Sequence, residues 1–200
     1  MTQAAAQSSA SASADVIVVG AGPAGSSAAY HMATLGLDVI LLEKQELGRD
    51  KVCGDGLTPS AVRELVSMGM DTTGWQRNRG LRVIGGGHLL HFPWPEQASF
   101  PSYGMARPRA LLDRDLAEHA AAAGARLLTG VEARPTNRVA YPGIEGPTTF
   151  TAPLVVDAGG VSARLATAVG RTKNERRPMG VAVRAYFRSP RAKDVWMESR

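Results

Sequence analysis

The sequence has few cysteines, no long apolar run and no signal peptide. Cys53 is the single cysteine among 200 residues, which excludes an internal disulfide framework and fits a reducing compartment. No apolar run approaches the roughly 18 residues that a spanning helix needs. Residues 1–14 are small and polar and lack the basic and apolar regions of a signal peptide, which predicts a disordered tail. We therefore expect a cytoplasmic protein whose membrane association, if any, is peripheral.

Aromatic residues make up only 6% of the chain, and none lies among the basic residues Arg171, Lys173, Arg176 and Arg177. The formal net charge of +5 would suit a nucleic acid, an anionic membrane surface or a diphosphate-bearing substrate. Binding of single-stranded nucleic acid generally needs aromatic platforms between the cations, so we expect no nucleic-acid partner. No acid or cysteine pattern accompanies the histidines, and no metal site is predicted.

Hydrophobic residues make up 44% of the chain. Those that follow residue 14 show the spacing of regular strands and helices. Residues 15–19 form a β-branched run typical of a parallel strand buried on both faces. Small and apolar residues then recur at helical spacing from Pro23 until Gly36, and residues 38–42 form a second apolar run. Strand, helix and strand within about 30 residues predict a βαβ unit with a parallel pair of strands. The predicted class is α/β with a Rossmann-like parallel sheet.

Later segments continue this alternation with an insertion. Thr58 and Pro59 predict the start of a helix over residues 59–68, and residues 81–103 are typical of hairpins from a different sheet. A helix ending at Gly124 and a strand at 126–130 follow. Residues 131–151, punctuated by Pro142, Gly146 and Pro147, predict a β-meander, and strands are expected at 154–157 and 181–188.

These elements predict two domains. Residues 15–80 and 106–178 would form the nucleotide-binding domain. Residues 81–105 and 179–200 would form part of a substrate-binding β-sheet domain that is incomplete at its C-terminus. The chain stops directly after a strand-like run without a cap, so we expect a fragment of a longer protein.

The glycine-rich loop between the first strand and helix carries the nucleotide prediction. Residues 20–25 read G-x-G-x-x-G, in which Gly20 permits the tight turn, Gly22 lets backbone approach a pyrophosphate, and Gly25 allows close packing of the helix. The pyrophosphate would lie at the helix N-terminus, at Pro23 and Ala24. Glu43 closes the second strand, where its carboxylate would accept hydrogen bonds from an adenosine ribose. This pattern fits both NAD and FAD, since each carries an ADP half.

The segment from Arg49 to Pro59 favours FAD over NAD. Its residues R-D-K-V-C-G-D-G-L-T-P, preceded by Glu43 and Lys44, resemble the geranylgeranyl reductase family. These are FAD-dependent reductases of isoprenoid double bonds, related to the aromatic-ring flavin hydroxylases. The resemblance extends from residue 15 to the end of the chain. It implies FAD as cofactor, a prenyl-type small-molecule substrate, and NAD(P)H or another reductant as electron donor.

The resemblance also implies which residues contact the cofactor. Arg109 would lie near the ribityl or phosphate groups, with Arg107 as the competing choice. Val131 would present backbone to the adenine. Related flavoproteins carry an Asp-Gly pair before a later Ser and Arg, whereas this sequence has Asp157-Ala158-Gly159-Gly160, so the contacts of that motif are altered. The implied cofactor-binding residues are Gly20, Gly22, Pro23, Ala24, Gly25, Glu43, Lys44, Arg49, Cys53, Gly54, Arg109, Val131, Asp157 and Gly159.

Two residues are weak candidates for catalysis. Cys53 would lie close to the flavin, as proton donor or as a small packing residue. Asp55 is either a site acid or a turn carboxylate that accepts hydrogen bonds from backbone N–H groups.

Three functions follow. The first is FAD-dependent reduction of isoprenoid C=C bonds, in a geranylgeranyl group or a prenyl-quinone side chain. The second is FAD-dependent aromatic monooxygenation, and the third is a non-catalytic flavin-binding fragment. In the family, a later Gly-Asp motif and most of the substrate sheet would follow Arg200, so activity is not predicted for the 200-residue chain alone.

Overall fold

The computed structural model describes residues 10–135, 143–145, 148–172, 174, 176, 178 and 180–200. The chain divides into two compact units, with residues 1–49 and 113–179 in the first and residues 50–112 and 180–200 in the second. Each unit is described by itself. The two-domain division expected from the sequence stays a prediction, and its residues 136–142, 146, 147, 173, 175, 177 and 179 lie outside the described residues. The same holds for residues 1–9 of the predicted tail.

The first unit is built on a parallel sheet. Its strands β2 (Val16–Val19), β3 (Val39–Leu42), β9 (Arg126–Leu128) and β13 (Leu154–Asp157) lie in the order β13-β2-β3-β9, and every neighbouring pair is parallel. Helix α1 (Pro23–Thr34) connects β2 to β3 and ends before Gly36, whose φ is +85°. The predicted βαβ unit and the α/β class are therefore confirmed.

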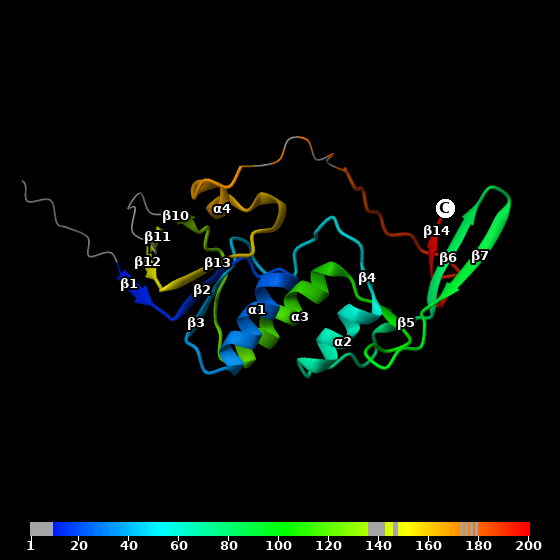
Figure 1. Cartoon of the computed structure of the whole chain (residues 1–200), viewed down its shortest axis with the longest axis horizontal. Helices are drawn as coiled ribbons and strands as arrows, with labels where there is room; N and C mark the ends of the chain where they lie inside the picture. The colour runs from blue at the N-terminus through cyan, green and yellow to red at the C-terminus, as the bar shows by residue number, and fades with distance from the viewer. Residues whose placement is uncertain are drawn as a thin grey trace, which may run out of the picture. The chain divides into compact units, whose positions relative to one another are not determined.

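Successive residues of β2 and β3 serve two different cores. Val16, Val18, Val39 and Leu41 pack with alanines of α1 and of α3 (Arg109–Ala122) on one face. Ile17, Ile40 and Leu42 pack with Phe150, Ala152 and Leu165 on the other. Burial of each aliphatic side chain contributes about 1.5–3 kcal/mol, and burial on both faces explains the continuous apolar runs. Figure 1 shows α1 beside β2 and β3.

A second sheet covers the face formed by Ile17 and Ile40. It contains β1 (Ala10–Ser13), β10 (Arg134–Pro135), β11 (Gly143–Glu145) and β12 (Thr148–Thr151), in the order β1-β12-β11-β10. The prediction of a disordered tail is wrong for residues 10–13, because β1 pairs in parallel with β12. The meander is confirmed by β10, β11 and β12, whereas Pro142, Gly146 and Pro147 lie outside the described residues. The short helices η1 (Gly160–Ser162) and α4 (Arg164–Ala168) follow β13.

The second unit begins with a helix packed on a small sheet. Thr58 caps α2 (Pro59–Ser67) by accepting from the Ala61 N–H at 3.5 Å, and Pro59 occupies the first turn, as predicted. The sheet pairs β4 (Gly56–Leu57) and β5 (Gln76–Asn78) with the central strand β8 (Gly104–Ala106). Val62, Leu65, Met68 and Met105 are buried here and form the core of this part of the unit.

A hairpin forms the other sheet of the second unit. Strands β6 (Gly80–Gly85) and β7 (His88–Pro93) are joined by Gly86 and Gly87, both at positive φ, as a two-residue type I′ turn requires. Strand β14 (Trp196–Ser199) adds to β6 in parallel. The predicted hairpin is confirmed. The prediction of a half-buried strand at 181–188 is wrong: Val181 is 94% exposed, and the described residues supply no neighbouring strand to pair with it.

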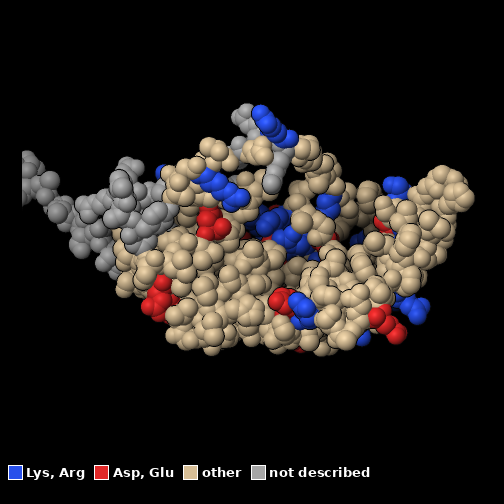
Figure 2. Space-filling model, in the orientation of Figure 1, with Lys and Arg blue, Asp and Glu red and all other residues tan. Residues whose placement is uncertain are grey.

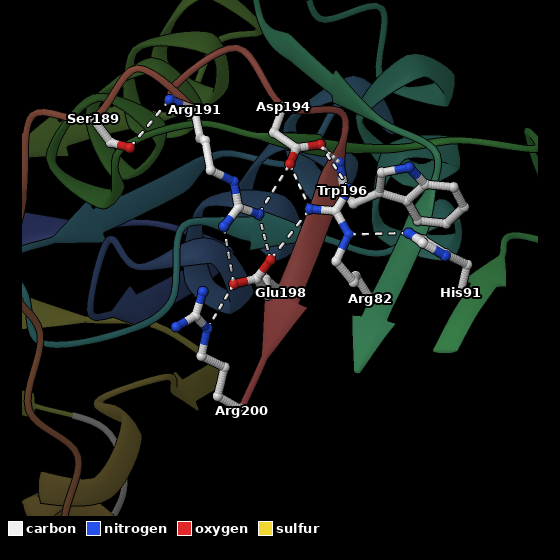
Figure 3. A network of polar contacts seen from close by, with 8 residues as sticks. All are labelled: Arg82, His91, Ser189, Arg191, Asp194, Trp196, Glu198 and Arg200. Atoms are coloured by element: carbon white, nitrogen blue, oxygen red, sulfur yellow. Dashed lines mark hydrogen bonds and ion pairs between the residues drawn. The ribbon is translucent and has the colours of Figure 1, made fainter. Parts of the chain in front are cut away.

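A network of ion pairs joins β14 to β6 (Figure 3). Arg82 of β6 contacts Asp194 at 2.5 Å and Glu198 at 3.2 Å, and its Nε donates to His91 Nε2 at 3.0 Å. Arg191 contacts the same two carboxylates. The hydrogen bonds from Arg82 to Asp194 and from Arg191 to Glu198 are the main reason that the pKa values of both acids fall to about 2. The two carboxylates therefore remain ionised and bridge guanidinium groups that come from different segments.

Among the described residues, no helix is both long and apolar enough to cross a membrane. On the face drawn in Figure 2, the atoms of basic and acidic side chains lie in small separate groups within a mostly uncharged surface.

Candidate nucleotide and flavin site

The predicted nucleotide residues of the first unit meet at the carboxyl edge of the parallel sheet. Gly20 N–H donates to the Leu42 carbonyl at 2.7 Å, and Ala158 N–H donates to the Val19 carbonyl at 2.8 Å. Val131 N–H donates to the carbonyl of Glu43 at 2.9 Å. The segments that follow β2, β3, β9 and β13 are therefore held side by side. In open α/β sheets this edge is where ligands bind.

Two glycines of the loop are required by close backbone packing. Gly20 has a φ of +102°, and a Cβ there would lie 2.7 Å from the Ala158 carbonyl oxygen. A Cβ on Gly25 would lie 1.8 Å from the Gly20 carbonyl oxygen and 3.1 Å from the Ala158 Cβ. The contacts of 2.7 Å and 1.8 Å with carbonyl oxygens are shorter than real Cβ atoms make. Gly20 and Gly25 therefore make the turn and bring α1 against the strands, as the sequence predicted.

The N-terminus of α1 has the form of an anion site. Gly22 is the N-cap in extended conformation, with no side-chain cap, and Pro23 begins the helix. The first N–H groups of a helix lack intrahelical partners, so without a cap those of Ala24 and Gly25 suit an anion at the positive end of the helix dipole. The residues present therefore fit the pyrophosphate of a dinucleotide.

Glu43 connects this loop to the end of β3. Its Oε2 accepts from the Ala21 N–H at 2.9 Å, and its Oε1 accepts from the Gln45 N–H at 3.2 Å. An ionised carboxylate has about four lone-pair sites, so capacity remains for ribose hydroxyls. Glu43 thus holds the loop and keeps an acceptor at the position expected for ribose recognition.

Asp157 and Gly159 have a structural explanation. The Asp157 carboxylate accepts from the Gly159 N–H at 3.0 Å and from the Ala166 N–H at 2.8 Å. A Cβ on Gly159 would lie 2.9 Å from the Asp157 Oδ1. Asp157 therefore holds the turn after β13 and stabilises the first turn of α4. Contacts of either residue with the cofactor stay a prediction.

A charged cluster that the sequence did not predict lies near the same edge. Glu132 contacts Arg134 at 2.9 Å and Arg164 at 2.8 Å. The hydrogen bond from Arg134, followed by the charges of Arg134, Arg164 and Lys44, holds the pKa of Glu132 below its usual value. No sequence spacing brings together residues from 44, 132 and 164. Only the parallel pairing of the sheet places them near one another.

The remaining predicted residues lie in the second unit, apart from Arg49, which is exposed at the end of a first-unit segment. Asp55 Oδ1 accepts from the Arg109 N–H at 2.9 Å, at the start of α3, and from Arg184 at 3.1 Å. Its Oδ2 accepts from the Tyr186 hydroxyl at 2.8 Å. Asp55 therefore connects its loop to the N–H at the start of α3 and to Arg184 and Tyr186, partners that the sequence did not predict. Its role as site acid or turn carboxylate stays a prediction.

Cys53, Gly54 and Arg109 differ in their surroundings. The Cys53 thiol is free and exposed, and a Cβ on Gly54 would meet nothing within 4 Å. Arg109 is buried, whereas the competing Arg107 places its guanidinium 5.1 Å from the centre of the Trp75 ring. The assignment of these residues to the flavin stays a prediction.

Two reductases are similar in sequence to most of this chain. The menaquinone reductase of Mycolicibacterium smegmatis is 40% identical over 196 residues, which are 93% of this chain and 47% of that protein. Digeranylgeranylglycerophospholipid reductase 1 of Methanopyrus kandleri is 33% identical over 167 residues, covering 78% of this chain and 42% of that protein. The chain spans about half the length of the curated relatives it matches.

Solved structures share the fold, and a family model matches nearly the whole chain. A flavoprotein/dehydrogenase from Cytophaga hutchinsonii has a TM-score of 0.70 at 25% identity, covering 79% of this chain and 42% of that one. A geranylgeranyl bacteriochlorophyll reductase-like protein from Thermoplasma acidophilum has a TM-score of 0.58 at 27% identity, covering 72% and 38%. The model of the FAD binding domain matches residues 13–199. The chain therefore belongs to the FAD-binding domain family, and FAD is its cofactor.

Proposed function

We propose that the full-length protein is an FAD-dependent oxidoreductase that reduces an isoprenoid C=C bond in a prenyl-quinone side chain. The observation that carries this proposal is the 40% identity to a menaquinone reductase across 93% of the chain. The similarity to digeranylgeranylglycerophospholipid reductases supports the coarser class of prenyl reductases, with a geranylgeranyl group as the second substrate class.

Different residues of the chain would bind different parts of FAD. The N-terminus of α1, with Gly22, Pro23 and Ala24, would hold the pyrophosphate, and Glu43 would hold the adenosine ribose. Lys44, Arg49 and Arg109 would add positive charge toward phosphate or ribityl oxygens. When bound and reduced by the electron donor, FAD would supply the hydride that a double bond needs for reduction.

Reduction also requires a proton, and Cys53 is the candidate donor. Its thiol is exposed, so the proton on Sγ is accessible from solvent. Asp55 is a weaker candidate, because both of its oxygens already accept hydrogen bonds. Cys53→Ala in the full-length protein should lower the turnover per bound flavin. Cys53→Ser is the matched variant, and turnover equal to wild type in both would leave Cys53 as a packing residue.

The decisive experiment supplies the flavin-loaded full-length protein with menaquinone and a reductant, either NAD(P)H or dithionite. We expect product that has gained two hydrogens in its side chain, detected by mass spectrometry. Gly22→Val is the control, because its side chain should block the approach of the pyrophosphate and abolish flavin binding. Loaded wild-type protein that saturates no prenyl double bond with either reductant would contradict the proposal.

The second candidate function is aromatic monooxygenation. A probable FAD-dependent monooxygenase from Pseudomonas aeruginosa has a TM-score of 0.66 at 22% identity, covering 84% of this chain and 48% of that one. This likeness concerns the fold alone, so it ranks below the prenyl-reductase proposal. NAD(P)H oxidation stimulated by a phenol, with oxygen incorporated into the product, would favour it. A chain of 200 residues that binds FAD without turnover would instead match the flavin-binding fragment.

We also propose peripheral contact of the full-length protein with membranes, because a prenyl-quinone resides in the bilayer. Flotation with lipid vesicles tests this proposal: the protein should float with the vesicles, and protein that stays at the bottom of the gradient would contradict it.

A further inference from the structure

The loop that carries Cys53 is held by one guanidinium group. Arg184 Nη1 donates to the Cys53 carbonyl oxygen at 3.3 Å and to Asp55 Oδ1 at 3.1 Å, and Nη2 donates to Asp50 Oδ1. Three oxygens from residues 50, 53 and 55 thus converge on a single side chain. A planar guanidinium can bridge several acceptors in fixed directions, which a lysine ammonium cannot do equally well.

Arg184 is unusual within its own segment. The side chains of its neighbours Val183 and Phe187 are largely solvated, with residue exposures of 91% and 87%, whereas the Arg184 side chain is only 13% exposed. Burial of a long charged side chain costs rotamer freedom and hydration, so it needs compensating contacts. Among the described residues, the hydrogen bonds and ion pairs of the Arg184 side chain are all with the loop at residues 50–55. The segment around Arg184 therefore contacts the loop through a few side chains, while its other side chains face solvent.

Tyr186 completes the arrangement two residues further on. Its hydroxyl donates to Asp55 Oδ2 at 2.8 Å, and the Arg184 guanidinium lies 4.7 Å from the centre of its ring. Partial desolvation, and then the hydrogen bond to Asp55, raises the pKa of Tyr186. The phenol therefore stays protonated and acts as a donor to Asp55, while its ring supports the arginine.

Asp55 links this contact to the start of α3, because the same Oδ1 that Arg184 contacts also accepts from the Arg109 N–H at 2.9 Å. We propose that Arg184 is a positioning residue that, together with Tyr186, holds residues 50–55 in the conformation in which Cys53 acts. This role in catalysis rests on the proposed prenyl reduction, whereas the restraint on the loop does not.

The first test measures the restraint itself by hydrogen exchange of the flavin-loaded full-length protein. Arg184→Ala should speed amide exchange within residues 50–56 by about tenfold or more, since it removes hydrogen bonds to charged groups. Arg188→Ala is the matched control. It lies on the same segment, is exposed, and makes no hydrogen bond or ion pair with the described residues. Equal exchange in Arg184→Ala and wild type would overturn the proposal.

The second test measures turnover with menaquinone. With variant and wild type compared at equal flavin loading, Arg184→Ala should lower kcat about 100-fold, the loss that a displacement of about 1 Å can cause, with KM unchanged. Added guanidinium ions should restore part of this kcat and part of the exchange protection, and an equal concentration of potassium chloride should not. Tyr186→Phe should lower kcat less, because the ring stays under Arg184. A rise in KM with unchanged kcat would contradict a positioning role.

The two tests also separate this inference from the proposed function. Wild-type protein without prenyl reduction would sink the proposed function, and hydrogen exchange would still decide on the restraint. Should Arg184→Ala fail to fold, Arg184→Gln keeps a polar, though shorter, side chain and removes its charge. Fast exchange at residues 50–56 in a folded Arg184→Gln variant supports the inference, and wild-type exchange overturns it.

Discussion

At the scale of single residues, the glycines of the nucleotide loop show how much the sequence determines. The spacing of Gly20 and Gly25 after a strand was enough to predict their packing roles, because each role depends on backbone near the same βα unit. The contact of Gly22 with a pyrophosphate stays a prediction. Asp157 shows the opposite case. Its contact with the Ala166 N–H depends on the turn after β13, and no local pattern predicted it. The same holds for Arg184 and Asp55, which are 129 residues apart.

Gly25→Ala should destabilise the protein and reduce its FAD content. The new Cβ would lie 1.8 Å from the Gly20 carbonyl oxygen, so the loop or α1 must move. Overpacking of this kind costs about 1–3 kcal/mol, and more where backbone is the obstacle. Chemical unfolding and the ratio of flavin to protein absorbance measure both effects. Gly85→Ala is the control, because its Cβ would meet nothing within 4 Å. Wild-type stability and flavin content in Gly25→Ala would argue against the packing described here.

At the scale of elements, local patterns predicted α1, β2, β3 and α2 because their hydrophobic periods and caps lie within each segment. Pairing between distant segments was not predictable in this way. Strand β1 lies in a segment of alanine and serine with no strand signal, yet it pairs with β12. Residues 181–188 have the alternation of a strand, but a strand also needs a neighbour that supplies hydrogen bonds.

The ion pairs between β6 and β14 should make the docking of β14 sensitive to acid. Both carboxylates have a pKa of about 2 in the folded protein, against ordinary values of 3.8 for Asp194 and 4.5 for Glu198. A lowered pKa in the folded state gives stability that is complete above the ordinary pKa and is lost as the pH falls through the folded value. We therefore expect β14 to loosen progressively between about pH 4.5 and pH 2.

Tryptophan fluorescence should follow this transition, because the Trp196 ring lies 4.6 Å from that of His91. Trp75→Phe and Trp94→Phe together would leave Trp196 as the single source of tryptophan fluorescence. Arg82→Gln removes one cation from the network and should shift the transition to higher pH, since the carboxylates lose a stabilising partner. An Arg82→Gln profile that coincides with that of wild type would show that the network does not hold β14.

At the scale of the whole molecule, the sequence predicted the class, the cofactor and the presence of a second sheet region. The compact units change at residues 49/50, 112/113 and 179/180, and these positions depend on tertiary contacts that no segment specifies alone.

FAD should raise the thermal stability of the apoprotein in proportion to the logarithm of its concentration. Ligand binding to the folded state alone adds about 2.7 kcal/mol at a free concentration 100 times the Kd. A melting series with increasing FAD measures this effect, with Gly22→Val as the variant that should not respond. A melting temperature of the wild-type apoprotein that stays constant across the series would contradict the assignment of the loop.

Because β2 is buried on both faces, its register in the sheet is fixed, and this register determines where the nucleotide loop lies. Odd and even residues of the strand belong to different cores, so sliding it by one position would exchange Val18 for Ile17 or Val19 and place each side chain in the wrong layer. The same slip would carry Gly20 about 3.3 Å along the strand axis. Packing that serves stability therefore also fixes where the pyrophosphate lies. A single-residue deletion within residues 16–19 would displace the binding loop even though every glycine of the motif remained.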